Sequence, residues 1–274
     1  MVRVFLLCVA LAVSGGVLAQ SGTGETYQPA SGQPGKDVVW VPTPYALVEK
    51  MLDMAQVTAQ DYVMDLGSGD GRNIIGAAKR GAKALGVEYN PEMVALSRRN
   101  AAAAGVGDKA QFREGDMFEA DISKATVLAL FLLPDNLRRL TPKFQELRPG
   151  TRLVMNGFAI PGWDPDETEQ AGGDCGNWCT SHLYYAPAKA AGTWRLQQQG
   201  VLTLEQNFQM LTGVYTAKGS KTPISNARVR GQEISFTVGD TQYVGRISGG
   251  SMSGEMKGPR PGQWKASRVG SHDH

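Results

Sequence analysis

Three glycines and one acidic residue form the most chemically suggestive stretch of this sequence. Gly67, Gly69 and Gly71 alternate with polar residues directly after the apolar run 62–66. Glycine at such positions lets the backbone approach a bound ligand closely. Asp65 stands near the end of the run, where its carboxylate can face a positively charged group of that ligand. The stretch predicts a ligand site built from a strand and a glycine turn.

Two further acidic residues stand at corresponding places downstream. Glu88 ends the run 84–88, and Asp116 follows the run 110–113. The carboxyl ends of parallel strands form the ligand crevice of an open α/β sheet. Glu88, roughly 20 residues after the glycine turn, is placed to accept hydrogen bonds from both hydroxyls of a ribose. Asp116 can accept from an adenine amino group, with the Met117 N–H facing a ring nitrogen.

The sign of the charge at the glycine turn selects among nucleotide ligands. Asp65 and Asp70 flank the turn, and no basic residue except Arg72 offsets them. A pyrophosphate would be repelled there, which disfavours NAD and FAD. S-adenosylmethionine carries an ammonium and a sulfonium that carboxylates attract, and helix N-terminal amides or Arg72 can hold its own carboxylate. We therefore predict S-adenosylmethionine as the cofactor. The residues expected to hold it are Asp65, Gly67, Ser68, Gly69, Gly71, Glu88, Asp116 and Met117.

Alternating strand and helix patterns would position these residues. Strand-like apolar runs occur at 62–66, 84–88, 110–113, 125–133 and 151–155. Helical patterns and short loops separate them, beginning with a helix over 44–56 for which Thr43 is the expected N-cap. The run 125–133 is expected to be the most buried strand. This alternation predicts an α/β fold with a doubly wound parallel sheet over residues 38–160.

The pattern changes after residue 160. Residues 161–192 are rich in Gly, Pro and Asp and predict an irregular connection. Short β-type segments separated by turn signals recur over 193–268. They predict a small β-rich C-terminal extension, an antiparallel sheet that either continues the first sheet or packs beside it. Residues 269–274 are expected to form a disordered tail.

The N-terminus has the three parts of a secretory signal. Arg3 provides a basic start, residues 4–13 are apolar, and Val17-Leu-Ala19 offers a small-residue cleavage site. The apolar run is short for a bilayer span, so an uncleaved anchor is disfavoured. We expect cleavage after Ala19, a secreted or periplasmic protein without a stable membrane span, and a flexible lead-in over 20–37.

Composition and cysteine content limit the remaining possibilities. The net charge is +2 and no Lys/Arg-rich run occurs, so no nucleic-acid partner is expected. No metal site is expected, because the histidines are only His182, His272 and His274. Cys175 and Cys179 would remain after signal cleavage, and the sequence leaves a disulfide and two free thiols equally open.

Several aromatic residues have more than one possible role. Tyr45 and Trp163 can line a wall for a methylated cation, although a core position suits Trp163 better. The cluster of Trp178, Tyr184 and Tyr185 either covers the crevice or packs against the C-terminal sheet. The sequence does not choose between these two arrangements.

The motifs in combination resemble a known family. Asp65-Leu-Gly-Ser-Gly-Asp-Gly71 with Glu88 and Asp116 resembles the cofactor motifs of class I S-adenosylmethionine-dependent methyltransferases. More narrowly, Val-Pro-Thr-Pro at 41–44 and Leu-Leu-Pro at 132–134 resemble the ATP synthase c-subunit lysine N-methyltransferase group and its bacterial relatives.

This resemblance, which covers residues 38–157, implies N-methylation of an amine such as a protein lysine. It also implies that Thr43 and Pro134 are substrate-side candidates near the methyl end of the cofactor. The residues alone identify no general base. The secretory signal motivates an alternative from another class, a non-catalytic exported protein that uses the same fold as a binding scaffold.

Overall fold

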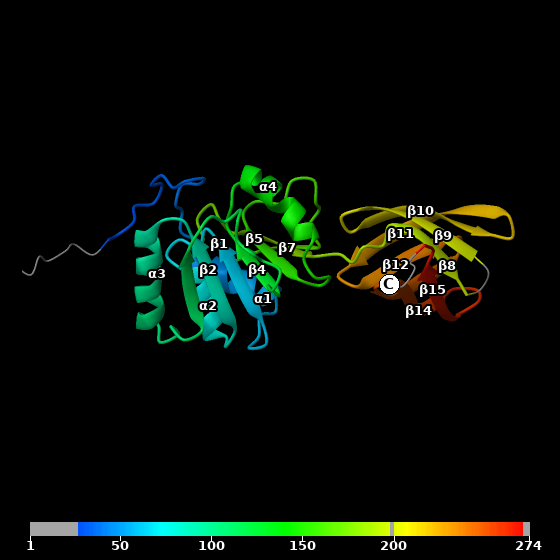
Figure 1. The fold of residues 1–274 in the computed structure, drawn as a ribbon, viewed down its shortest axis with the longest axis horizontal. Coiled ribbons are helices and arrows are strands. Elements are labelled where there is room, and N and C mark those ends of the chain that lie inside the picture. Colours follow the sequence, from blue (N-terminus) through cyan, green and yellow to red (C-terminus); the bar gives the residue numbers. More distant parts are fainter. Residues whose placement is uncertain (1–26, 198–199, 271–274) are drawn as a thin grey trace, which may run out of the picture.

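The structure is a computed structural model that describes residues 27–197 and 200–270. The predicted signal peptide, the first residues of the lead-in and the end of the predicted tail lie outside these residues. Figure 1 shows an α/β unit followed along the chain by a β-barrel. Within the described part of the chain, no helix combines the length and apolarity needed to cross a membrane.

The α/β unit contains one mixed sheet with helices on both faces. Its helices are α1 (Tyr45–Met54), α2 (Arg72–Lys79), α3 (Pro91–Ala103) and α4 (Pro134–Gln145). Its strands are β1 (Tyr62–Leu66), β2 (Lys83–Glu88), β3 (Ala110–Glu114), β4 (Val127–Leu130), β5 (Arg152–Asn156), β6 (Glu167–Gln170) and β7 (Thr180–Tyr185). The strand order is β3-β2-β1-β4-β5-β7-β6. Strands β1 to β5 run parallel, as predicted, and the sheet reverses its winding direction between β1 and β4.

Side chains of the central strands point alternately to two hydrophobic cores. Val63 packs with α1, α2 and α3 on one face, whereas Met64 packs with α4 on the other. Strands that are buried on both faces have near-continuous apolar sequences, and for this reason their positions could be predicted. Asn90 caps α3 by accepting from the Glu92 N–H at 2.9 Å. Thr43 does not cap α1, because Pro44 occupies the N-cap position.

The expectation of an irregular connection over 161–192 is wrong. Strands β6 and β7 form there and extend the sheet, with β7 antiparallel to β5. Leu183 and Tyr184 of β7 are fully buried on opposite faces of the sheet. Cys175 and Cys179 form a disulfide in the loop that precedes β7.

The C-terminal extension is a closed antiparallel barrel. Its strands are β8 (Gly192–Leu196), β9 (Gly200–Asn207), β10 (Met210–Ala217), β11 (Ser220–Arg230), β12 (Glu233–Val238), β13 (Thr241–Ser248), β14 (Ser251–Lys257) and β15 (Gly262–Arg268). Pairing of β15 with β8 closes the barrel, so each of its eight described strands has a neighbour on both sides. The interior has its own core, in which Trp194, Phe236 and Trp264 are fully buried. The prediction of a β-rich extension on a doubly wound α/β sheet is confirmed.

An aromatic stack and several polar contacts join the two units. The Trp163 ring stacks on Phe208 of the β9–β10 turn, with centroids 4.9 Å apart and planes 11° apart. Arg228 of the barrel pairs with Asp166 at 2.6 Å, and Gln209 donates to the Asp164 carbonyl at 2.6 Å. Trp163 is therefore a core residue, as the sequence favoured, and does not line an aromatic wall.

Candidate functional site

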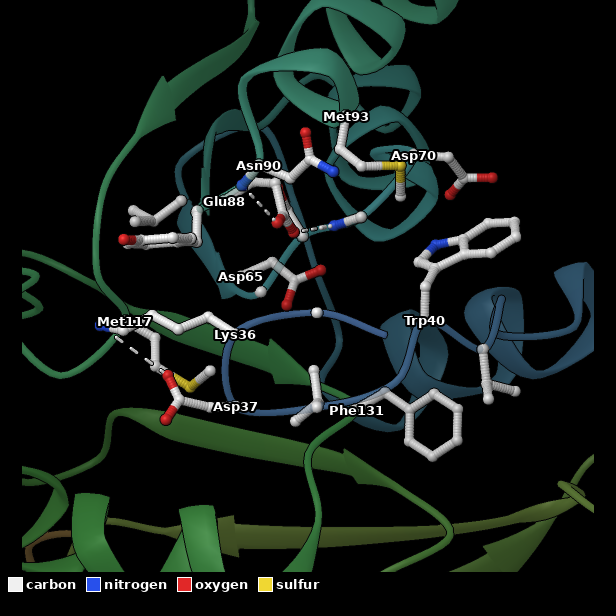
Figure 2. A pocket seen from close by; sticks show the side chains of 18 of the residues that line it. Lys36, Asp37, Trp40, Asp65, Asp70, Glu88, Asn90, Met93, Met117 and Phe131 are labelled. Carbon is white, nitrogen blue, oxygen red and sulfur yellow. Dashed lines mark hydrogen bonds and ion pairs between the residues drawn. The ribbon is translucent and has the colours of Figure 1, made fainter. Parts of the chain in front are cut away.

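A cleft that is open to solvent lies at the carboxyl ends of the parallel strands. It sits beside β1 and β4, where the winding of the sheet reverses and α/β proteins bind their ligands. Figure 2 shows Asp65 and Glu88 in the middle of the cleft. The same view places Met117 at one end and Phe131 at the other. Of the predicted site residues, those that line the cleft are Thr43, Asp65, Gly67, Ser68, Gly69, Glu88, Asp116 and Met117.

Two glycines of the turn are required for different reasons. Gly69 has φ 54°, and a Cβ there would lie 2.7 Å from Nε1 of Trp40 across the cleft. Gly71 has φ 89° and is the N-cap of α2, where a Cβ would lie 2.6 Å from the Phe112 ring. Gly71 is not among the lining residues. The glycine at 71 thus serves the packing of α2, and its predicted contact with the ligand stays a prediction.

Asp65 is a buried carboxylate at the centre of the cleft, with 3% of its surface exposed. Asn73, in the first turn of α2, donates from Nδ2 to Oδ2 of Asp65 at 3.0 Å. Burial, together with the charges of Glu88 and Asp70, raises the pKa of Asp65 to about 7, although the hydrogen bond from Asn73 lowers it. In the absence of a cationic ligand, Asp65 is therefore only partly ionised near neutral pH.

Asn73 is a site residue that the sequence analysis missed. It lines the cleft and is 4% exposed, and its Oδ1 is buried without a hydrogen-bond partner in the described chain. A buried polar atom without a partner is costly unless a ligand or water satisfies it. Asn73 could have been identified from its position two residues after Gly71, in the helix turn that faces β1.

Glu88 connects the glycine turn to the end of β2. Its two carboxylate oxygens accept from the Gly69 N–H at 2.9 Å and from the Asn90 N–H at 3.0 Å. These bonds fix the carboxylate within the cleft and leave lone pairs for further donors. Ribose binding by Glu88 stays a prediction that this geometry accommodates.

The lead-in segment folds across the Asp116 end of the cleft. Lys36 forms an ion pair with Asp116, and its ammonium lies 4.6 Å from the centre of the Tyr89 ring. The hydrogen bond from Lys36 lowers the pKa of Asp116 and raises that of Lys36. The oxygen predicted to accept from adenine is thus already engaged by a lysine of the chain itself.

The opposite end of the cleft contains a paired arginine. Arg72 donates from Nε to Asp70 Oδ1 at 2.9 Å and from its guanidinium to the Thr43 carbonyl at 2.5 Å. The Thr43 hydroxyl accepts from Nδ2 of Asn156 at 3.2 Å. Thr43 therefore reaches the cleft as predicted, whereas Pro134 opens α4 and is not among the lining residues.

The residues of the cleft fit S-adenosylmethionine. Asp65 and the unpartnered Oδ1 of Asn73 are acceptors suited to an ammonium or a sulfonium. Glu88 lies beside them, and the glycine turn gives the ligand access to the backbone. A pyrophosphate would meet the carboxylates of Asp65, Asp70 and Glu88 and no unpaired cation among the described lining residues.

Comparison with a solved structure defines the class of protein. The crystal structure of an RNA methyltransferase from Salinibacter ruber in complex with S-adenosyl-L-homocysteine matches with a TM-score of 0.51 and 44% sequence identity. The match covers 54% of this chain and 95% of that one. The fold and the acid-lined cleft are those of a class I S-adenosylmethionine-dependent methyltransferase, and S-adenosylmethionine is the cofactor.

Sequence relatives define the family within this class. A protein-lysine N-methyltransferase of Saccharolobus islandicus is 47% identical over 133 residues, which is 47% of this chain and 83% of that protein. The mouse ATP synthase c-subunit lysine N-methyltransferase is 35% identical over 136 residues, and the match spans 55% of its length. The ANTKMT methyltransferase domain matches residues 65–167. The chain belongs to this protein-lysine N-methyltransferase family. The matched domain ends before the barrel begins.

Proposed function

We propose that this protein is an enzyme that transfers a methyl group to lysine side chains of a partner protein outside the cytoplasm. The observation that carries the proposal is the family match, because its relatives are named for lysine methylation. The cleft supports the cofactor half of the reaction through Asp65, Asn73 and Glu88.

The reaction requires little covalent chemistry from the protein. Bound S-adenosylmethionine would supply a methyl group on a sulfonium, and an N–C bond would form as the S–C bond breaks, giving a methylammonium and S-adenosylhomocysteine. The described lining residues include no histidine, and the Asp65 carboxylate is held by Asn73. In this proposal the lysine binds as the ammonium, passes its proton to water, and then attacks the methyl carbon as the neutral amine. Alignment of amine and methyl carbon supplies up to roughly 7–11 kcal/mol.

Export is the part of the proposal that depends on residues 1–19. The Cys175–Cys179 disulfide supports it, because disulfides persist mainly in oxidising compartments. Determination of the mature N-terminus from the producing cell tests this point. A chain that begins at residue 20 supports export, and an intact Met1 in a cytoplasmic fraction contradicts it.

The methylation proposal is tested with the mature chain, labelled S-adenosylmethionine and a protein extract of the cell envelope. Mass spectrometry should find methylated lysine in a labelled protein. The Asp65→Ala variant should reduce labelling strongly because it removes the central carboxylate of the cleft. If wild type binds no cofactor by calorimetry, the non-catalytic scaffold is the better description.

RNA is a second candidate acceptor, favoured by the name of the Salinibacter ruber relative at 44% identity. The same labelled cofactor is offered to total RNA and to envelope protein in parallel. Label confined to nuclease-sensitive material would replace the lysine proposal with RNA methylation. Label confined to protease-sensitive material would remove the RNA candidate.

A further inference from the structure

Three aromatic rings meet at the end of the cleft that lies away from Lys36. Phe131 lines the cleft and directly follows β4, and Figure 2 shows it at the opposite end from Met117. Phe158 follows β5, and Trp178 comes from the loop before β7. The Trp178 centroid lies 5.1 Å from that of Phe131 and 5.6 Å from that of Phe158. Three connections of the sheet thus contribute one ring each.

These rings lie at the edge of the hydrophobic core, since Phe158 packs against the core beneath α4 and neither Phe131 nor Trp178 belongs to a core cluster. Phe131, Phe158 and Trp178 are all half-buried. By contrast, the three rings that contact one another inside the barrel, Phe236, Tyr243 and Trp264, are buried. Five other rings among the described residues already have a lysine or arginine over their face. None of those contacts involves Phe131, Phe158 or Trp178. The trio therefore offers aromatic surface to a cation from outside the chain.

Local covalent and backbone features hold Trp178 in this position. The Cys175–Cys179 disulfide closes the loop around it, and Cys175 is buried. The Trp178 N–H donates to the Cys175 carbonyl at 2.9 Å. Gly157 leaves room for the indole, because a Cβ there would lie 3.0 Å from the ring. An indole held by a covalently closed loop is pre-organised for binding.

We propose that Phe131, Phe158 and Trp178 form an aromatic wall that binds the side chain of the acceptor lysine, before and after methylation. This inference rests on the proposed lysine methylation. The apolar stem of a lysine packs on the rings, and its ammonium or methylammonium lies against their faces. Trp178 binds the acceptor in this scheme and takes no part in holding the cofactor.

The test measures binding of a cation probe and needs no turnover. The probe is Nα-acetyl-Nε-trimethyllysine methylamide, titrated by calorimetry into the complex of the full chain with S-adenosylhomocysteine. Trp178→Ala should weaken binding of the probe by about 2- to 30-fold, the range of a cation–ring contact. Trp178→Phe keeps an aromatic face and should lose less. The affinity for S-adenosylhomocysteine should stay within about twofold in both variants, because Trp178 is not among the cleft-lining residues.

Two controls separate a cation site from general apolar packing. A probe whose quaternary nitrogen is replaced by carbon has the same shape without the charge, and wild type should bind it more weakly. Cys175→Ser with Cys179→Ser opens the loop and should reproduce the loss of the cation probe without substitution of a ring. This second variant also keeps the test decisive if Trp178→Ala fails to fold.

The outcome of this binding test can be distinguished from a failure of the proposed lysine methylation. Equal affinity of wild type and Trp178→Ala for the cation probe overturns the aromatic wall, whatever the enzyme methylates. A parallel loss of S-adenosylhomocysteine binding also overturns it, since Trp178 would then support the cofactor. Selective loss of the cation probe supports the wall, even if the labelled-extract experiment finds no methylated lysine.

Discussion

At the scale of single residues, the buried Asp65 carboxylate makes cofactor binding depend on pH. The pKa of this carboxyl group is about 7 in the folded protein, against an ordinary value of 3.8, chiefly because burial disfavours the charged form. The cofactor carries an ammonium and a sulfonium and favours ionised Asp65. Binding therefore lowers the pKa of Asp65 and releases a proton when the pH is below about 7.

We expect the affinity for S-adenosylmethionine to rise between pH 5 and pH 8 and to level off above the pKa of Asp65. Calorimetry in buffers of different ionisation enthalpy measures the proton released on binding. Asp65→Asn keeps an oxygen that can accept from Asn73 but cannot ionise. This variant should bind more weakly and release no proton, and release that persists in it would assign the titration to another group.

The same carboxyl group affects stability with a defined sign. Because its pKa is raised in the folded state, the folded protein binds more protons than the unfolded chain between about pH 4 and pH 7. The contribution of Asp65 to stability therefore falls as the pH rises through this window. Asp65→Asn should raise the free energy of unfolding of the ligand-free protein at pH 8 relative to wild type and have less effect at pH 4. Urea titrations at both pH values measure the difference.

The acidic residues of the site could be predicted because strand ends are readable from the sequence. Asp65, Glu88 and Asp116 each terminate or follow an apolar run, and parallel strands bring those ends to one edge. Asn73 and Phe131 could not be located in this way. Their place in the cleft depends on which side of α2 faces β1 and on β4 ending at Leu130, before the apolar run itself ends.

At the scale of elements, the lead-in segment contributes a feature of the site that the sequence did not indicate. A bridge between Pro34 and Val39 shapes it into a turn, and Val38 packs against the core beneath α4. The Asp37 carbonyl accepts from Asn136 at 3.3 Å. These contacts hold Lys36 over Asp116. Nothing in a Gly-, Ser- and Pro-rich composition indicates such contacts, because the partners are distant in sequence.

Lys36→Met should strengthen the binding of S-adenosylhomocysteine. The substitution keeps an apolar stem and removes the ammonium that occupies Asp116, so an adenine amino group no longer competes with it. The difference from wild type should shrink at high salt, because Lys36 is exposed and its ion pair is screened. Calorimetry at low and high salt provides both measurements.

A matched control for this prediction is Lys50→Met. Lys50 of α1 also forms an ion pair with an acidic residue, Glu169, but neither residue lines the cleft. Its substitution should leave S-adenosylhomocysteine binding unchanged. If Lys36→Met instead weakens binding, Lys36 contacts the cofactor and the competition described above is wrong.

Prediction of the elements succeeded for the parallel strands and failed for β6, β7 and the closure of the barrel. The central strands β1, β4 and β5 are buried on both faces, and all five parallel strands were located to within a few residues. Strand β6 is mostly exposed, and β7 follows a loop rich in Gly, so neither produced a clear signal. Closure of the barrel could not be predicted because it depends on pairing β15 with β8, more than 60 residues apart.

At the scale of the whole molecule, the barrel and the cofactor cleft are separate. Within the described chain, the residues that line the cleft lie between Gln33 and Phe131, and the core of the barrel shares no member with the two cores of the α/β unit. Phe208 is the point of apolar contact, because it belongs to the barrel but packs against the core beneath α4. The barrel therefore affects the α/β unit through stability and not through the cleft.

Phe208→Ala should destabilise the protein without loss of cofactor binding. It removes the ring stacked on Trp163, and because Phe208 is only half-buried the cost should be about 2 kcal/mol, below the 3–5 kcal/mol typical of a buried phenylalanine. Urea unfolding followed by tryptophan fluorescence measures this loss, and calorimetry with S-adenosylhomocysteine should give the wild-type affinity. Met210→Ala, at an exposed position two residues away, is the control and should change neither quantity. Loss of cofactor affinity in a folded Phe208→Ala protein would show that the barrel and the cleft are coupled, contrary to the separation inferred here.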